Sequence, residues 1–349
     1  MKFEATTIKD IAKALNISTS TVSRALQDHY AISPETKKLV LECAEKLNYR
    51  PNPAALSLRE RKTLSIGIIV CEIANSFFSQ VINGVESLTS EKGYNVIISQ
   101  THESYDREVA DMDFLSSRSI DGLLISISAE TNNLDHIRKL HKMGLPMVFF
   151  DRIVPDIQTH TVVVDNFKGA YDATTHLLQN GYTKIAAIAG SEFLSITNER
   201  LAGYTEALKN YNVQPDADYI KHCFYGGMRS AELEEAIDEL MNLQNRPEAI
   251  FAASDKLTTG CLSYLHNHSI TVPEEIALVG FLNSDIANLL NPALTTVRQP
   301  AFEMGKTAAE LLLQLIKSKR PVTEFEKKVL VPELIIRDSS IDRKAYTIH

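Results

Sequence analysis

The sequence predicts a head of three helices in a helix-turn-helix arrangement, followed by a doubly wound α/β body divided into two lobes. Two observations lead to this prediction. Three short amphipathic segments, each with a helix-start signal, fill the first 50 residues, and from residue 64 onward short apolar runs alternate with helical patterns. The 349 residues, of which 44% are hydrophobic, are enough for a small module and a larger two-part body.

The charge of the chain is divided unevenly between these parts. Residues 1–62 hold 11 Lys and Arg against 7 Asp and Glu, so the head carries a formal charge of +4 and the rest of the chain −12. This asymmetry is expected where only one end of a protein meets a polyanion.

Targeting segments and cysteine motifs are not visible in the sequence. No stretch has the pattern of a signal peptide or a membrane span, so we expect a cytoplasmic protein. Cys43, Cys71, Cys223 and Cys261 are scattered and form no CxxC pair. This spacing argues against a zinc site and a disulfide framework, and favours reduced, mostly buried thiols.

The first two helices of the head are predicted from their start signals. Thr7 precedes Asp10 by three residues, which is a capping-box pattern, and apolar residues follow at helical spacing over residues 8–15. After a short turn, Ser18 can cap a second helix formed by TSTVSRAL. The inward face of this helix is expected to consist of Val22, Ala25 and Leu26.

A third helix completes the head. Ser33 followed by Pro34 combines a capping residue with a proline at the first helical position. Two short helices joined by a tight turn and braced by a third make a helix-turn-helix unit. The apolar stripe of the third helix is expected to be Leu39, Val40, Cys43, Ala44 and Leu47.

The second helix has the side chains of a DNA-reading surface. Short hydroxylated residues let a helix backbone approach the major groove, and an arginine fork can pair with guanine. Thr19, Ser20 and Arg24 supply this set. The alternative is an amphipathic surface helix whose hydroxyls are merely solvated.

The stretch NYRPNPAALSLRERK links the head to the body. Asn52 can cap a helix that begins at Pro53 and ends before the charged RERK. A helix of about two turns is too short to be stable alone in water. We therefore expect it to fold only against DNA and a second copy of the chain.

The body is predicted from its apolar runs, which read as buried parallel strands. More than six such strands suggest two sheets, with a ligand cleft at the carboxyl ends of the strands. The runs are SIGIIV, NVIIS, GLLIS, PMVFFD, KIAAIAG, AIFAAS and IALVGF.

Enzyme motifs are missing from the sequence. It contains no GxGxxG after a strand, no GxxxxGK[ST], no GxSxG and no HExxH, and its histidines have no metal-binding spacing. We therefore expect no catalytic residues, no metal and no cofactor. Two other classes of protein fit the sequence less well. The basic head and the absence of an export signal argue against a periplasmic solute-binding protein. The absence of catalytic motifs argues against an α/β enzyme fused to a DNA-binding head.

The segments TIKDIAKALNISTSTVSRAL and NYRPN, with the hinge that follows, resemble the lactose/galactose-repressor family of bacterial transcription regulators. The likeness extends to about Ser340 and implies a body like that of periplasmic sugar-binding proteins. It implies a helix-turn-helix domain over residues 1–50, a hinge over 51–63, an effector-binding and dimerisation domain over 64–340 and a tail over 341–349. The first lobe is expected to comprise 64–162 and 292–322, and the second 163–291 and 323–340.

The resemblance extends to single residues. Leu58 occupies the place of the hinge leucine that wedges between base pairs in the minor groove, and the alternative is a linker residue that packs on its own domain. Arg200 resembles the ligand-gripping arginine of the family, and Tyr225 matches an aromatic position of its cleft. The predicted DNA-binding residues are Thr7, Thr19, Ser20, Thr21, Ser23, Arg24, Ser33, Asn52 and Leu58.

The cleft residues are proposed mainly from polar positions at strand ends, where each could instead cap a helix or brace a loop. The predicted effector-binding residues are Asn75, Phe77, Ser126, Asp151, Arg152, Arg200, Tyr225, Ser254, Asp255, Asn283 and Gln299. One departure from the family concerns the ligand. In VGFLNS, Leu282 stands where the family commonly has an aspartate, which points to a different or less hydroxylated ligand.

Together these observations predict a ligand-responsive regulator, expected to be a repressor, that binds palindromic operator DNA as a homodimer. A small molecule in the cleft, expected to be a sugar or sugar derivative, changes the angle between the lobes and the spacing of the hinges. The C-terminal SSIDRKAYTIH lacks a leucine heptad, which argues against a tetramer. The sequence leaves open the operator, the regulated genes, the identity of the effector, whether the effector induces or co-represses, and whether the protein represses or activates.

Overall fold

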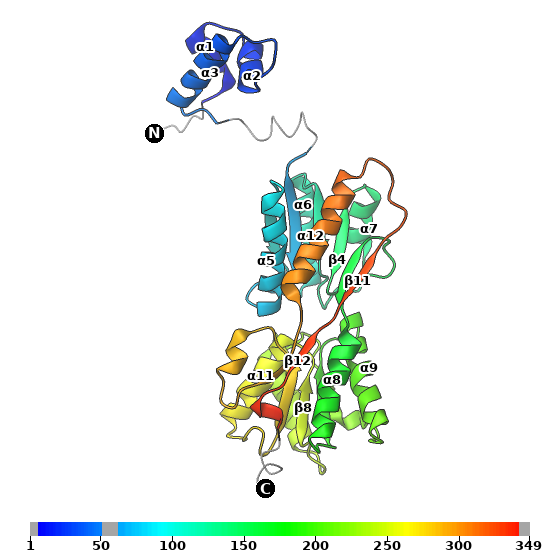
Figure 1. Ribbon diagram of the computed structural model, residues 1–349. Coiled ribbons are helices and arrows are strands. Elements are labelled where there is room, and N and C mark those ends of the chain that lie inside the picture. The colour runs from blue at the N-terminus through cyan, green and yellow to red at the C-terminus, as the bar shows by residue number, and fades with distance from the viewer. Residues whose placement is uncertain (1–5, 51–61, 342–349) are drawn as a thin grey trace. The chain divides into compact units, whose positions relative to one another are not determined.

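The computed structural model describes residues 6–50 and 62–341, and it divides into two compact units between Thr63 and Leu64 (Figure 1). The first unit is helical. The second unit contains two six-stranded sheets with helices packed on their faces. The predicted fold class, a helix-turn-helix head and a two-lobed α/β body, is confirmed.

The helices of the head begin at the predicted caps. Thr7 donates from both its backbone N–H and its hydroxyl to Asp10 Oδ2, at 2.8 and 2.7 Å. The Ser18 hydroxyl accepts from the backbone N–H of Thr21 at 3.1 Å, and Ser33 caps the third helix in the same way. The three helices are α1 (Ile8–Leu15), α2 (Thr19–Leu26) and α3 (Pro34–Lys46).

The core of the head lies where the three helices meet. The expected stripe of α3 is partly wrong, because Leu39 and Leu47 are 55% and 37% exposed. Successive helical residues are rotated by about 100°, so a face centred on Val40 and Ala44 leaves Leu39 on the outer side. The buried residues of this core are Ile11, Ala12, Val22, Ala25, Val40 and Ala44.

We predict that Ser18→Ala costs about 1 kcal/mol in the local stability of α2, because the N–H of Thr21 loses its capping acceptor. Hydrogen exchange of the amides of α2 in the full chain measures this loss. Ser18→Asn is the matched control, since asparagine is also a good cap. Equal exchange rates in the alanine and asparagine variants would contradict the capping role.

The first sheet of the body is entirely parallel. Its strands, in spatial order, are β11 (Lys327–Leu330), β5 (Thr161–Val164), β4 (Met147–Phe150), β3 (Gly122–Ile125), β1 (Ser65–Val70) and β2 (Asn95–Gln100). With it go the helices α5 (Ser76–Glu91), α6 (Tyr105–Ser117), α7 (Asp135–Lys142) and α12 (Ala301–Lys317). We call this sheet and its helices the first lobe.

The second sheet is parallel except for its edge strand β12, which runs antiparallel to β10. Its strands, in spatial order, are β12 (Glu333–Ile335), β10 (Thr295–Arg298), β9 (Ala277–Phe281), β8 (Ala249–Ala252), β6 (Ile185–Ala189) and β7 (Ile220–His222). Its helices are α8 (Asn166–Gln179), α9 (Ser195–Asn210), α10 (Ser230–Met241) and α11 (Asp255–Asn267), with 3-10 turns at Ala217–Tyr219, Asp285–Asn288 and Asp338–Ser340. These elements form the second lobe.

The chain crosses between the lobes at other residues than the resemblance implies. Strand β10 pairs with β9, although 292–322 was expected in the first lobe, and β11 pairs with β5, although 323–340 was expected in the second. A strand belongs to the lobe whose sheet it pairs with. Because the whole of β5 lies in the first sheet, the expected end of the first segment of the first lobe at residue 162 is also too early. The crossings follow β5, β10 and β11.

Helices α5 and α12 pack at two glycines, where their backbones come too close for a side chain. A Cβ on Gly84 of α5 would lie 2.0 Å from the carbonyl oxygen of Phe302 in α12, and one on Gly305 would lie 2.0 Å from that of Val81. Figure 1 shows these two helices side by side. Because α5 begins at the cleft, this contact fixes the direction in which its first turn points.

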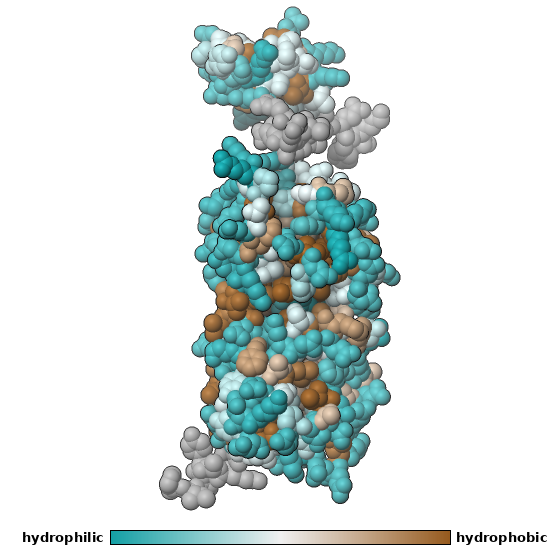
Figure 2. All heavy atoms as spheres, turned by 90° about the vertical axis from the view of Figure 1, so that its right-hand side faces the viewer, coloured by the Kyte–Doolittle hydropathy of each residue, from teal (hydrophilic) through white to brown (hydrophobic). Residues whose placement is uncertain are grey.

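The surface of the body is mainly polar, with apolar patches midway along the face seen in Figure 2. The four cysteines are free thiols, and all but Cys43 are buried, as predicted. Within residues 6–50 and 62–341, no helix is both long and apolar enough to span a membrane.

Candidate functional site

The exposed face of α2 carries the predicted base-reading side chains. Thr19, Ser20 and Arg24 are exposed, whereas Thr21 and Ser23 are half-buried. Within residues 6–50 the structure shows an ion pair between Lys37 and Asp28 (2.6 Å) and none at Arg24. The Arg24 guanidinium is therefore available to an external partner.

The other predicted DNA contacts of the head lie at helix starts. Thr7 and Ser33 are exposed, and their hydroxyls are used by the caps of α1 and α3. Free backbone N–H groups at such ends suit phosphate oxygens. Tyr30, which is not among the predicted DNA-binding residues, is 91% exposed and stacks on His29 with 4.5 Å between ring centroids. Asn52 and Leu58 lie outside the described residues.

In the body, the carboxyl ends of strands from both sheets surround a cleft of about 550 Å³, including the part open to solvent. Loops that follow β1, β2 and β4 line it on the first lobe, and residues after β6, β7 and β8 line it on the second. Four of the predicted effector-binding residues line this cleft: Asn75, Arg152, Arg200 and Ser254.

The remaining predicted residues lie behind or beside this lining. Phe78 and Phe224 line the cleft, whereas their neighbours Phe77 and Tyr225 do not. Tyr225 instead lies against the Arg229 guanidinium, with 3.4 Å between its ring centroid and Cζ. The others outside the lining are Ser126, Asp151, Asp255, Asn283 and Gln299.

Arg200 is the most constrained side chain of the cleft. It lies one turn into α9 and is only 3% exposed. Its Nε donates to Asn166 Oδ1 at 2.8 Å, and its Nη2 donates to Gln299 Oε1 at 3.0 Å. Its Nη1 donates to the carbonyl oxygen of Ala253, and the guanidinium lies on the Phe281 ring, 3.8 Å from the centroid.

These contacts leave part of the Arg200 fork unused. A guanidinium has five N–H groups, and three of them are bonded here, all to neutral acceptors. No carboxylate among the described residues forms an ion pair with it. Burial lowers the pKa of Arg200 to about 10, so the side chain stays charged at neutral pH. The cleft therefore contains a buried cation that lacks a bonded anion.

Asp151 and Ser126 lie in the first lobe, outside the lining of the cleft. Both are buried, and Asp151 has a left-handed backbone conformation with φ of 59°. Burial raises the pKa of the Asp151 carboxyl, opposed by the charges of Arg152 and Arg200. Its Oδ2 lies 3.9 Å from Arg152 Nε. Asp151 thus lies beside Arg152 without lining the cleft itself.

Ser254 and Asp255 begin α11 on the second lobe. The Ser254 hydroxyl caps this helix by accepting from the backbone N–H of Leu257 at 3.3 Å. Asp255 Oδ1 accepts from the backbone N–H of Asn283 at 3.4 Å. Burial raises the pKa of Asp255 to about 7, so its carboxyl is close to half-ionised at neutral pH.

Asn283 and Gln299 join the lobes. Asn283 exchanges two hydrogen bonds with Gln80 of α5: Gln80 Nε2 donates to its carbonyl oxygen at 2.8 Å, and its own Nδ2 donates to Gln80 Oε1 at 3.2 Å. Asn283 Nδ2 also donates to the carbonyl oxygen of Gln299 at 2.7 Å. Because Gln299 holds Arg200, a chain of hydrogen bonds leads from the cleft to the first lobe. Leu282 is buried in the core of the second lobe.

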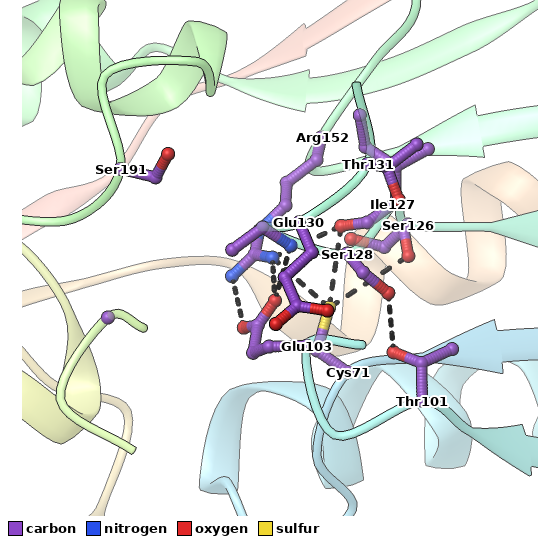
Figure 3. A network of polar contacts seen from close by, with 12 residues as sticks. Cys71, Thr101, Glu103, Ser126, Ile127, Ser128, Glu130, Thr131, Arg152 and Ser191 are labelled. Carbon is purple, nitrogen blue, oxygen red and sulfur yellow. Dashed lines mark hydrogen bonds and ion pairs between the residues drawn. The ribbon is translucent and has the colours of Figure 1, made fainter. Parts of the chain in front are cut away.

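Two lining residues that were not predicted, Glu103 and Ser191, also lie just beyond the carboxyl ends of strands. Glu103 is the third residue after β2, in the loop THESYD, and Ser191 is the second residue after β6. Both follow the carboxyl end of a parallel strand, where Asn75 was also found. Figure 3 shows Glu103 and Arg152 pointing toward each other, with Ser191 on the other side of the cleft.

Comparisons with known proteins agree with this architecture. Residues 7–52 match a family model described as bacterial regulatory proteins, lacI family, and residues 174–340 match the periplasmic binding protein-like domain. The chain is 33% identical over 335 residues to the HTH-type transcriptional repressor PurR of Vibrio vulnificus, covering 95% of this chain and 98% of that protein. The PurR of Aliivibrio salmonicida is 32% identical with the same coverage.

Solved structures give the same result. A transcriptional regulator CelR–cellobiose complex has a TM-score of 0.71 and 29% identity, covering 96% of this chain and 99% of that one. The lac repressor dimer bound to operator and the anti-inducer ONPF has a TM-score of 0.79, covering 97% and 100%. At 22% identity, this likeness shows the fold alone.

Proposed function

The chain belongs to the lacI family of bacterial regulatory proteins, and from this premise we propose that it binds a palindromic operator as a homodimer and releases or grips it in response to a small molecule in the cleft. The relatives that it matches along nearly their whole length are named transcriptional repressors. These names favour a regulator over an enzyme or a solute-binding protein. We further propose that it acts as a repressor in the cytoplasm, without a membrane partner.

The observation that supports effector binding most directly is the buried Arg200. Burying a cation is costly unless hydrogen bonds and charge compensate for it. Arg200 retains two unbonded N–H groups in a cleft between the lobes, and a ligand oxygen can complete them. A ligand held there also contacts the first lobe, because Asn75 and Arg152 line the opposite wall.

A sugar or sugar derivative suits this cleft. Phe78 and Phe224 supply apolar walls against which a sugar ring can pack, and Asn75 and Ser254 supply polar groups for hydroxyls. A regulator of 29% identity is solved as a cellobiose complex. By the family resemblance, Leu282 stands where an aspartate is common, and the loss of that charged acceptor favours a different or less hydroxylated ligand.

The cleft and the operator are connected through the lobe angle. A ligand that bridges the lobes changes their angle only if it binds one arrangement better than the other. Asn283 and Gln80 are placed to report that change, because they join the second lobe to α5 and to the Arg200 network. In a dimer, a change in lobe angle alters the spacing of the two hinges and thus of the two recognition helices.

A thermal-shift screen with sugars, sugar phosphates and purines tests this function. A ligand that binds only the folded state at about 100 times its Kd stabilises the protein by about 2.7 kcal/mol. We expect at least one sugar-type compound to raise the Tm and to change operator binding at the same concentrations. If every stabilising ligand left operator binding unchanged, the proposed coupling would be wrong.

For the hinge, we predict that Leu58→Ala weakens specific operator binding and reduces the bend of the operator, because a leucine inserted in the minor groove unstacks a base step. Energy transfer between dyes at the operator ends measures the bend. Leu56→Ala is the neighbouring control. A bend that is the same in wild type and Leu58→Ala would identify the segment as a plain linker.

A further inference from the structure

A buried ion pair occupies the wall of the cleft on the first lobe. Arg152 and Glu103 form a two-pronged pair, in which Nη1 lies 2.6 Å from Oε2 and Nη2 lies 2.8 Å from Oε1 (Figure 3). Their side chains are 12% and 8% exposed, and both line the cleft. The planar fork of arginine matches a carboxylate in this geometry, so the two charges cancel locally.

The surroundings hold both partners in place. Glu103 Oε2 also accepts from the backbone N–H of Ala129 at 2.8 Å. Arg152 Nη1 also contacts the carbonyl oxygen of Ile127 at 3.1 Å and Cys71 Sγ at 3.2 Å. Glu103 has a φ of 64°, a left-handed conformation that glutamate rarely adopts. Such strain persists only where the surrounding contacts enforce it.

The two arginines of the cleft therefore differ. Arg200 on the second lobe is bonded only to neutral acceptors, whereas Arg152 on the first lobe is already bonded to a carboxylate. An anionic ligand group at Arg152 would have to break two charge-assisted hydrogen bonds and would face the Glu103 carboxylate. An uncharged hydroxyl can approach this wall without separating the pair.

From this difference we propose that Glu103 determines which ligands the cleft binds. Because Glu103 holds Arg152, the first-lobe half of the cleft binds an uncharged, hydroxyl-bearing part of the ligand. Phosphate and carboxylate groups are excluded from that half. The proposal rests on the effector function of the cleft and specifies its ligand class. Any negative group of the ligand is directed to the second lobe, where Arg200 and Lys256 line the cleft. Removing the charge of Glu103 converts the first-lobe half into an anion site.

Inorganic phosphate tests this proposal without knowledge of the effector or the operator. Phosphate is titrated at constant ionic strength into wild type, Glu103→Gln, and Glu103→Gln combined with Arg152→Gln, and the Tm is followed. Glutamine has the shape of glutamate and still accepts from Ala129. We expect the apparent Kd for phosphate to fall at least about tenfold in Glu103→Gln, because the freed fork gains charge-assisted hydrogen bonds, and to return to the wild-type value in the double variant.

Two results would overturn the proposal: an unchanged phosphate Kd in Glu103→Gln, or an equal gain in the double variant. If Glu103→Gln does not fold, single variants in the wild-type background decide. Any stabilisation of wild type by phosphate should persist in Arg152→Gln and weaken in Arg200→Gln. Its loss in Arg152→Gln, with or without a loss in Arg200→Gln, would contradict the proposal. If the ligand screen fails but these titrations succeed, only the effector function is refuted.

Discussion

Replacing Arg200 with alanine is expected to weaken effector binding by about 10- to 150-fold and to leave operator binding without effector nearly unchanged. Hydrogen bonds to a charged group contribute roughly 1.5 to 3 kcal/mol, and Arg200 is a buried cation of the cleft that has no bonded carboxylate within the described chain. The residue lies in the body, far along the chain from the head that reads DNA. The variant therefore separates sensing from DNA binding.

The measurement is an effector titration of wild type and variant, with operator binding as the readout. Arg246→Ala is the matched control, because Arg246 is an exposed arginine of the same lobe. The alternative, that Arg200 pairs with a surface carboxylate such as Glu199, predicts a loss under about 1 kcal/mol and intact sensing. The 3% exposure of Arg200 does not fit that alternative. An unshifted effector midpoint in a folded variant would remove Arg200 from the site.

Replacing Arg24 with alanine is expected to cost about 1 to 3 kcal/mol at the specific operator, which is about 5- to 150-fold in Kd. Arg24 is exposed on α2 and forms no ion pair within the described head, so its fork is free to pair with a guanine edge. Binding to DNA of unrelated sequence should fall much less, because phosphate contacts supply most of that affinity.

Fluorescence anisotropy with operator and unrelated duplexes at one salt concentration measures both affinities. Lys13→Ala is the control: Lys13 is an exposed cation at the end of α1, and its loss should affect both duplexes by similar factors. If Arg24→Ala also lowered both affinities equally, Arg24 would be a phosphate contact, and base reading would belong to other residues of α2.

The head could be predicted almost completely from the sequence, because its start signals are local. Thr7, Ser18 and Ser33 each bond to a backbone or side-chain group within three residues, so the pattern that predicts each helix also contains the contacts that start it. Leu39 was misassigned because a five-residue apolar stripe fits more than one helical face.

The body was predictable where strands are buried on both faces, and less so elsewhere. All seven apolar runs form strands. Strand β11, with the sequence KKVL, is largely exposed, so its sheet is decided by pairing with β5 and not by hydrophobicity. The same long-range pairing sets the crossings between the lobes, which no local pattern encodes.

The cleft was predictable to the extent that its residues follow parallel strands. This rule located Asn75, Arg152 and Ser254, and the resemblance supported Arg200. Successive residues of a helix point in directions about 100° apart, so the side chains of neighbours in α5 face different surroundings. Phe78 therefore lines the cleft, whereas Phe77 does not. That Glu103 holds Arg152 depends on two loops 49 residues apart in the chain.

If a ligand in the cleft controls binding to the operator, the affinity for the operator must depend on that ligand. The operator is first selected from random DNA with the full chain, and a stabilising ligand from the thermal screen is then added to the protein–operator complex. We predict that the ligand shifts the operator Kd of wild type at least about tenfold, a coupling of about 1.4 kcal/mol, and that the shift is lost in Arg200→Ala. A ligand that raises the Tm through Arg200 while the operator Kd stays constant would contradict the claim.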